Sequence, residues 1–539
     1  MHVVSLRIAI EPDPIDRQEP MHLPEAEFAE LARLVRQHAQ ASPGRVAIIE
    51  GERRLDYAGL DALMDRVVVA LQRADVGPGH TVAICAAASI DYAVVFLGVL
   101  RAGAAVAPLA PGSTRTVLRA MLQDCAPSVL FVDAAAVRLL DGPAANAASD
   151  SGPARVALDG SAAAISLQAW LAAPGCMPEP VEIAPESPFN IIYSSGTTGA
   201  PKGIVQSHAM RWAHVRRGAR YGYSARTVTL LSTPLYSNTT LVVFVPTLAF
   251  GGTVVLMPKF DAAGYLALAQ QHRVSHTMLV PVQYQRLLAH SDFDRHDLSS
   301  FSVKFATSAP FAAALKAEVL RRWPGQLIEF YGMTEGGGTC ILEAHAHPDK
   351  LHTVGRPAEG HDIRLIDDTG REAAPGEAGE VVGHSPSMMT GYHNQPDKTR
   401  DAQWFDATGK RFIRTGDIGR FDAQGFLTLI DRSKDMIISG GFNIYPSDIE
   451  AVLREHPAVV EVAVVGVASQ RWGETPVAFV VRRAPAPAAA CGGDLLEWAN
   501  ARLSKLQRLH SVELIAELPR SAIGKVLKRE LRDRAQGAT

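Results

Sequence analysis

The sequence predicts an α/β fold: a large N-terminal domain of doubly wound mixed sheets with a small β-barrel subdomain, followed by a small α+β C-terminal domain. In the first half of the chain, helical patterns alternate with short β-branched runs, as in parallel sheets covered by helices on both faces. From about residue 361 to 430 the pattern changes to short strands separated by turns, which is typical of a small antiparallel barrel or sheet. The 539 residues also exceed what one hydrophobic core usually sustains. We therefore expect an N-terminal arm at 1–25, the N-terminal domain at 26–431 and the C-terminal domain at 432–539.

The first part of the chain supplies much of this alternation. We expect helices at 28–38 and 57–75 and strands at 81–85, 128–132 and 189–192. Residues 134–180 are rich in Ala, Gly and Pro with weak periodicity, which predicts a surface connection.

The alternation resumes after residue 203. We expect strands at 227–231, 253–257 and 276–280 and a helix at 262–271. Pro246, Gly251 and Gly252 interrupt the apolar run 241–257, so this run should be two core elements and not a membrane span. The β-rich part should hold strands at 363–366, 379–383, 411–414 and 427–430. The C-terminal domain should hold a helix at 447–455 and strands at 460–466 and 477–482.

Composition narrows the class of protein. The net charge is −3, with 47% hydrophobic and 20% charged residues. The chain therefore lacks the basic surplus that would indicate a nucleic-acid partner. The five cysteines are odd in number and lack CxxC spacing, which favours reduced thiols. Acidic residues interrupt the N-terminus where a signal peptide would be apolar. We expect a cytoplasmic protein.

A Ser/Thr/Gly-rich loop follows the strand expected at 189–192. Residues 193–203 read YSSGTTGAPKG, and a phosphate could be bound by the following members: Ser194, Ser195, Gly196, Thr197, Thr198, Gly199 and Lys202. Glycines let backbone N–H groups approach an anion, hydroxyls donate hydrogen bonds, and the lysine adds a positive charge. The spacing differs from the GxxxxGK[ST] loop of Walker-type ATPases. The alternative is an ordinary solvated turn.

Four further motifs follow in order: YGMTE at 331–335, RTGD at 414–417, DRSKDMIISGGFNIYPSDIE at 431–450 and PRSAIGK at 519–525. Together with the loop they resemble the adenylate-forming superfamily of acyl-CoA synthetases, peptide-synthetase adenylation domains and firefly luciferase, over roughly residues 30 to 530. The resemblance implies a ligase that joins a carboxylate to the α-phosphate of ATP, releases pyrophosphate and passes the acyl group to the thiol of coenzyme A. ATP, Mg²⁺ and coenzyme A are its implied cofactors and co-substrates.

The resemblance also assigns nucleotide-binding roles. It implies that Glu335 binds Mg²⁺ and that the Thr334 hydroxyl reaches the α-phosphate; a helix cap is the alternative reading of this pair. Asp417 would bind the ribose, with a turn aspartate as the alternative. The other implied nucleotide contacts are Ser308, Ala309, Tyr331, Gly332, Met333 and Arg432. The superfamily more often has glycine around Ser308 and Ala309, which bears on the shape of the pocket.

Lys525 is the residue expected to bring the two anionic reactants together in the first half-reaction. The alternative is a surface lysine in a basic tail. By resemblance the C-terminal domain is mobile: it rotates about Lys434, so that Gly440 and Gly441 cover the site during thioester formation. The PRSAIGK string also resembles sites that lysine acyltransferases modify and deacylases restore, and acetylation would remove the charge of Lys525.

The segment PLYSNTT at 234–240 and the glycines after Glu335 should line the acid pocket, through the following residues: Tyr236, Ser237, Asn238, Gly332, Gly336 and Gly337. The glycine run is expected to leave extra room. Relatives that activate amino acids carry an aspartate in this segment, whereas many fatty-acyl and aryl relatives carry histidine where Ser237 lies. Medium-chain fatty and aromatic carboxylates are the leading substrate classes.

Because the chain ends soon after Lys525, coenzyme A is favoured as acceptor; a stand-alone ligase that loads a carrier protein is the alternative. A luciferase-like oxygenase and an inactive nucleotide-binding scaffold are disfavoured, and a dimer is possible.

Overall fold

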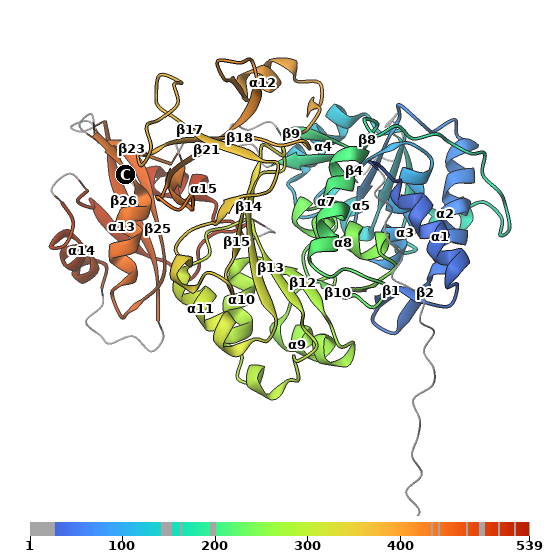
Figure 1. Cartoon of the computed structure of the whole chain (residues 1–539), viewed down its shortest axis with the longest axis horizontal. Helices are drawn as coiled ribbons and strands as arrows, with labels where there is room; N and C mark the ends of the chain where they lie inside the picture. The colour runs from blue at the N-terminus through green and yellow to red at the C-terminus, as the bar shows by residue number, and fades with distance from the viewer. Residues whose placement is uncertain are drawn as a thin grey trace, which may run out of the picture.

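The computed structural model describes residues 27–141, 153–161, 164–194, 201–432, 435–439, 442–469, 473–483, 491–504, 507–521 and 524–537. Two large mixed sheets, both joined by helical crossovers, form most of the molecule, and two smaller sheets follow in sequence (Figure 1). The α/β fold expected from the sequence is confirmed.

The first large sheet has nine strands in the order β16-β15-β14-β13-β12-β10-β11-β1-β2. Its strands are β1 Val46–Glu50, β2 Arg53–Asp56, β10 Val228–Leu231, β11 Thr253–Leu256, β12 His276–Leu279, β13 Val303–Ala306, β14 Gln326–Gly332, β15 Thr339–Glu343 and β16 Arg356–Pro357. Its central pairs are parallel, as in β13–β14 with Val303 opposite Gln326, whereas β2, β15 and β16 pair antiparallel. The carboxyl ends of β12, β13 and β14 therefore meet at one edge.

The second large sheet has eight strands in the order β19-β9-β8-β4-β3-β5-β6-β7. Its strands are β3 Thr81–Cys85, β4 Ala105–Pro108, β5 Val129–Val132, β6 Ala154–Ala157, β7 Ile165–Ser166, β8 Pro188–Ser194, β9 Lys202–Ser207 and β19 Gly391–Tyr392. β8 and β9 form an antiparallel hairpin in which Ser194 lies opposite Lys202. The phosphate-type loop therefore joins these two antiparallel strands.

Helices separate and cover the two large sheets. The helices are α1 Leu31–Ala41, α2 Tyr57–Gln72, α3 Ile90–Arg101, α4 Arg115–Cys125, α5 Ala134–Asp141, α6 Leu167–Trp170, α7 His208–Arg220, α8 Asn238–Ala249, α9 Ala262–Gln271, α10 Pro281–Leu288 and α11 Ala313–Arg322. The largest core joins residues of both sheets through α1, α2, α3, α7 and α8, so these helices lie between the sheets. α9, α10 and α11 pack on the outer face of the first sheet, and α4 and α5 on that of the second. Pro246 lies inside α8, where it is buried.

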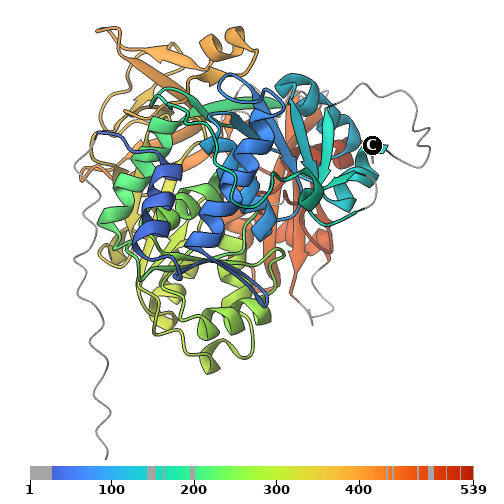
Figure 2. The ribbon, with the colours of Figure 1, turned by 90° about the vertical axis from the view of Figure 1, so that its right-hand side faces the viewer.

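The third sheet is antiparallel and contains β17 Asp362–Ile366, β18 Gly379–His384, β20 Gln403–Phe405, β21 Arg411–Phe421 and β22 Leu427–Arg432, with α12 Pro396–Asp401 inserted. The fourth sheet contains β23 Ile437–Ser439, β24 Phe442–Ile444, β25 Val459–Ser469, β26 Gly473–Arg482 and β27 Ser511–Leu514, packed with α13 Pro446–Arg454, α14 Gly492–Asn500 and α15 Lys528–Gly537. Figures 1 and 2 both place the third sheet at the end of the molecule opposite α9. Among the described residues, no helix is long and apolar enough to cross a bilayer.

Two expectations about the fold need correction. Residues 134–180 are not only a connection, because β6 adds to the edge of β5 and buries Val156 and Ala157. The strand expected at 411–414 continues to Phe421, so Asp417 lies within β21 and not in a turn. There its backbone pairs with that of Arg432 on β22, which brings two expected nucleotide contacts to adjacent strands.

Candidate active site

The carboxyl ends of β13 and β14 open onto the expected nucleotide site. Tyr331, at the end of β14, donates a hydrogen bond from Oη to Asp417 Oδ2 at 2.8 Å. Burial, and then the charge of Asp417, hold the pKa of Tyr331 well above its usual range, so the phenol stays a donor. Tyr331, an expected nucleotide contact, and Asp417, the expected ribose ligand, are thus hydrogen-bonded to one another.

Thr334 and Glu335 lie in a turn between β14 and β15, and no helix follows them. The helix-cap alternative is therefore wrong. Tyr392 Oη donates to Glu335 Oε1 at 2.9 Å, and Lys202 Nζ lies 4.8 Å from the centroid of the Tyr392 ring. Met389 N also donates to the carbonyl of Glu335 at 2.8 Å. Tyr392, which the sequence did not indicate, joins the expected Mg²⁺ ligand to the lysine of the phosphate-type loop.

A buried polar network supports this turn from behind. Gln206 Nε2 donates to the carbonyl of Thr334 at 2.6 Å, and its side chain also contacts Asn190 at 2.9 Å. The Arg211 guanidinium donates to Asn190 Oδ1 and to Asn238 Oδ1, each at 2.8 Å, and to Gln206 Oε1. Burial lowers the pKa of Arg211 to about 9. The Oδ1 of Asn238, expected to face the acid, is therefore engaged by Arg211.

Ser308 has an unusual backbone conformation. Its φ is +78°, in the left-handed region that costs a residue with a Cβ about 1–2 kcal/mol. Its hydroxyl forms a 2.7 Å hydrogen bond with Thr239 Oγ1 on α8. The structure thus gives a physical reason for the glycine common at this place in the superfamily, and shows what holds a serine there.

We expect Ser308→Ala to lower the free energy of unfolding by about 1 kcal/mol, because it loses the hydrogen bond and keeps the strain. Ser308→Gly should cost less, because glycine relieves the left-handed strain. Denaturant unfolding of both variants measures the difference; an alanine variant at least as stable as the glycine variant would contradict this account.

The glycines after Glu335 do not leave extra room for an acid. A Cβ at Gly336 would lie 2.3 Å from the carbonyl oxygen of Ser387, and one at Gly338 would lie 2.2 Å from Ile363 Cδ1. A Cβ at Gly337 would lie 2.7 Å from Ile413 Cβ. The expectation of extra room is wrong, because residues of the third sheet and of the turn after β18 fill that space. The glycines let the sheet pack against the turn that carries Glu335.

Lys525 is held next to the first sheet. Gly524 has a φ of +76°, and a Cβ there would lie 3.0 Å from Val282 Cγ1 and 3.2 Å from Val280 Cγ2. Val280 directly follows β12, so the backbone at Lys525 lies beside the carboxyl edge at which Ser308 and Tyr331 are found. The alternative from the sequence, a surface lysine in a basic tail, does not fit this position beside the first sheet.

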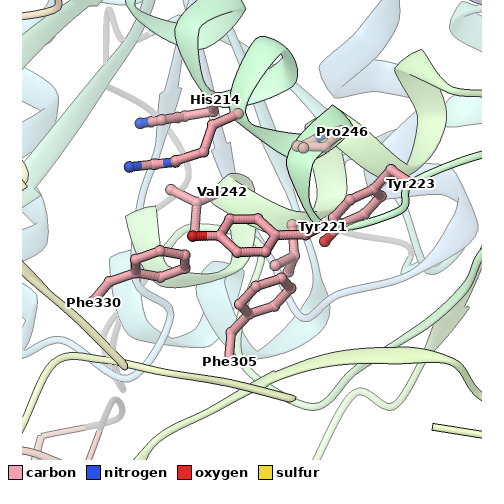
Figure 3. Close-up of a pocket in the computed structure, with 10 residues that line it drawn as sticks. His214, Tyr221, Tyr223, Val242, Pro246, Phe305 and Phe330 are labelled. Carbon is pink, nitrogen blue, oxygen red and sulfur yellow. The ribbon is translucent and has the colours of Figure 1, made fainter. Parts of the chain in front are cut away.

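The expected acid-pocket segment lies at the start of α8. Ser237 caps this helix by accepting a hydrogen bond from Thr239 N at 3.2 Å, and burial raises the pKa of Tyr236 to about 12. Between α7, α8 and the first sheet lies a small cavity of about 10 Å³, room for about one water molecule (Figure 3). Its lining residues are His214, Arg217, Gly218, Tyr221, Tyr223, Val242, Val243, Pro246, Phe305 and Phe330. The sequence did not indicate the α7 residues, because no motif marks them.

Several expected site residues fall outside the description. Residues 195–200, Lys434, Gly440 and Gly441 are not described, nor are the side chains of Ser194 and Arg432. Of the described ones, Ser308, Tyr331, Thr334, Glu335 and Asp417 gather with Lys202 around the turn after β14. Among the described residues, no three His, Cys, Asp or Glu side chains could hold a metal ion together. A single carboxylate, Glu335, fits Mg²⁺ that takes its other ligands from phosphate and water.

Comparison with known proteins agrees with this geometry. Residues 35–393 match the AMP-binding enzyme family, and residues 448–525 match the C-terminal domain of AMP-binding enzymes. The chain is 36% identical over 516 residues to an indoleacetate–CoA ligase of Aromatoleum aromaticum, covering 93% of this chain and 98% of that protein. It is 31% identical to the long-chain-fatty-acid–CoA ligase FadD13 of Mycobacterium tuberculosis, covering 93% and 97%.

Among solved structures, ATP-bound MatB from Rhodopseudomonas palustris superimposes with a TM-score of 0.82 at 28% identity, covering 94% of this chain and 99% of that one. Both matched regions and the near full-length relatives lead to one assignment. The chain belongs to the AMP-binding enzyme family, the AMP-forming acyl-CoA synthetases.

Proposed function

We propose that this protein is an ATP-dependent carboxylic acid:CoA ligase, which forms an acyl-adenylate with release of pyrophosphate and then an acyl-CoA thioester. The observation that carries the proposal is the meeting of Lys202, Glu335 and Tyr392 beside the Tyr331–Asp417 pair. Three different sheets contribute these residues, as expected of a site that holds all parts of ATP. A fatty or an aromatic carboxylate is the acid; the relatives named above act on one of each class.

In the first half-reaction a carboxylate oxygen attacks the α-phosphorus, and the bond to pyrophosphate breaks. Lys202 and the loop that joins β8 to β9 hold the β- and γ-phosphates, where negative charge grows as pyrophosphate leaves. Tyr331 packs on the adenine, while Asp417 and Arg432 hold the ribose. Bound Mg²⁺, with Glu335 as its protein ligand, would neutralise phosphate charge.

Lys525 acts between the two anionic reactants in this step. The packing of Gly524 against Val280 and Val282 supports this role, because it holds the backbone next to Lys525 beside the carboxyl edge of the first sheet. For thioester formation, residues 432–539 rotate about Lys434 relative to residues 26–431, and Gly440 and Gly441 then approach the path of the CoA thiol. The thiol attacks the acyl carbonyl, and AMP leaves.

A panel of carboxylates, measured by pyrophosphate release with and without coenzyme A, tests the function. At least one fatty or aromatic acid should support pyrophosphate release. With coenzyme A present, that acid should be turned over continuously and yield an acyl-CoA product. Turnover with a holo-carrier protein and none with coenzyme A would replace the proposal with a carrier-loading ligase. No acid-dependent release with any acid would refute acyl-adenylate formation.

Tyr392→Phe should slow adenylation about 10-fold, because a hydrogen bond to an ionised carboxylate is lost and Glu335 is less well oriented. The Mg²⁺ concentration that gives half-maximal rate should rise as well. Tyr265→Phe is the matched control, because that buried tyrosine donates a hydrogen bond to Thr277 Oγ1 at 2.9 Å, away from the site. Removing this hydrogen bond should leave the adenylation rate unchanged. Equal rates for Tyr392→Phe and wild type would remove Tyr392 from the site.

A further inference from the structure

The turn that carries Lys525 is closed by backbone hydrogen bonds. Ser521 N donates to the Lys525 carbonyl at 2.8 Å, and Lys525 N donates to Ser521 Oγ at 3.2 Å. Gly524 N donates to the Ser521 carbonyl at 2.8 Å, and Gly524 has a φ of +76° in the left-handed region. Arg520 and Val526 pair antiparallel on the two sides of this turn. The backbone N–H and carbonyl of Lys525 are therefore both held within the turn.

The side chain of Arg520 holds the peptide group just before Lys525. Arg520 Nη1 donates to the Gly524 carbonyl at 2.8 Å, and its Nη2 donates to Glu461 Oε1 on β25, also at 2.8 Å. The Gly524 carbonyl and the Lys525 N–H belong to one planar peptide group, so fixing the carbonyl also fixes the direction of this N–H. Because the guanidinium is planar and rigid, it connects the turn to the fourth sheet with a defined geometry.

Glu461 keeps the Arg520 guanidinium in place. The ion pair is half-buried, with side chains that are 24% and 21% exposed. Hydrogen bonds between ionised groups are stronger than those between neutral groups. The carboxylate also balances the positive charge of Arg520 on a turn that carries a second positive charge at Lys525.

These contacts lie within the C-terminal domain. Leu518 and Val526, on either side of Arg520, pack against the core formed by β25, β26 and α15. Towards the first sheet, Arg520 and Glu461 border a cavity of about 400 Å³, which residues of α10 line from the other side. In the proposed domain rotation, the hydrogen bonds of Arg520 therefore move together with Lys525.

We propose that Arg520 is a positioning residue for adenylation: held by Glu461, it fixes the Gly524 carbonyl and thereby sets the direction in which Lys525 reaches the reactants. This inference rests on the proposed acid:CoA ligase activity, with Lys525 acting in the first half-reaction. A displacement of about 1 Å in a reacting geometry can lower a rate about 100-fold. Arg520 acts through Lys525, so its loss should slow the first half-reaction and leave the second unchanged.

The test measures the two half-reactions separately, as acid-dependent pyrophosphate release in a single turnover and as thioester formation from a supplied acyl-adenylate. Arg520→Met should lower the maximal rate of pyrophosphate release about 10-fold or more. The concentrations of ATP and acid that give half the maximal rate should change by less than about 2-fold, since neither reactant loses a binding contact. Thioester formation should proceed at the wild-type rate.

Three further variants separate positioning from a general loss of structure. Arg520→Lys keeps the charge and one hydrogen bond, so it should recover part of the loss. A double variant with Glu461→Gln should release pyrophosphate no more slowly than Arg520→Met alone, because Glu461 acts through Arg520. Arg534→Met is the matched control: its Nε lies 3.7 Å from Glu513 Oε2 in the same domain, and its loss should change neither half-reaction.

Hydrogen–deuterium exchange gives a readout that does not depend on turnover. The segment 520–527 should exchange faster in Arg520→Met than in wild type or in Arg534→Met. Unchanged exchange, an unchanged rate of adenylation, or equal slowing of both half-reactions in Arg520→Met would each overturn the inference while the ligase function stands. If wild type releases no pyrophosphate with any acid, the proposed function fails. The exchange measurement then decides by itself whether Arg520 holds the backbone at Lys525.

Discussion

Lys525→Ala should reduce acid-dependent pyrophosphate release about 100- to 1,000-fold, because a positive charge about 4 Å from an anionic reactant contributes about 4 kcal/mol at intermediate dielectric. The same variant should convert a supplied acyl-adenylate to acyl-CoA at nearly the wild-type rate, since Lys525 has no role in the second step. Both half-reactions are measured by following pyrophosphate and thioester separately.

Incorporating acetyl-lysine at position 525 provides the control for side-chain length. Acetylation removes the charge and keeps the side chain. The acetylated protein should therefore lose as much of the adenylation rate as Lys525→Ala does. Normal adenylation by the acetylated protein would show that the charge is dispensable and that acylation cannot regulate the enzyme. Loss of both half-reactions in Lys525→Ala would contradict the division of labour between them.

Gly383→Ala should destabilise the protein by about 3 kcal/mol and abolish adenylation. A Cβ at Gly383 on β18 would lie only 1.5 Å from the carbonyl oxygen of Gly337, so one backbone must move. Gly337 is two residues after Glu335, and this movement would displace the carboxylate from Tyr392. Chemical denaturation and pyrophosphate release measure the two effects.

Gly112→Ala is the control for this substitution, because a Cβ there meets no heavy atom within 4 Å. It should change neither stability nor activity appreciably. A Gly383→Ala variant as stable and active as Gly112→Ala would show that the third sheet does not hold the turn that carries Glu335.

The predictable helices and strands are those whose apolar residues repeat with a clear helical or strand period and whose ends are marked by turn residues. β3, β11 and α9 match their expected ranges closely, because β-branched or helical patterns end at turn residues. α3 carries almost no polar face: nearly all of it is buried between the two large sheets, so its sequence shows no amphipathic period. β6 has only four residues, and its pairing with β5 gives it a stability that no local pattern reveals.

The nucleotide-site residues were predictable where a motif marked them. Tyr331 and Asp417 were assigned from separate motifs, and the structure shows them hydrogen-bonded. Tyr392 was missed because it lies on a two-residue strand without a motif, and only the pairing of β19 with β9 brings it to Glu335. The α7 residues that line the cavity of Figure 3 were missed because no motif marks them, and the packing of α7 between two sheets was not evident from the sequence.

Isotope transfer tests the central claim, acyl-adenylate formation followed by thioester formation, most directly. The enzyme is given ATP, coenzyme A and an acid labelled with ¹⁸O in both carboxylate oxygens, and the products are analysed by mass spectrometry. Attack of the carboxylate on the α-phosphorus predicts AMP with one ¹⁸O atom, an acyl-CoA that keeps the other, and unlabelled pyrophosphate. Unlabelled AMP, or ADP with labelled phosphate, would contradict the account.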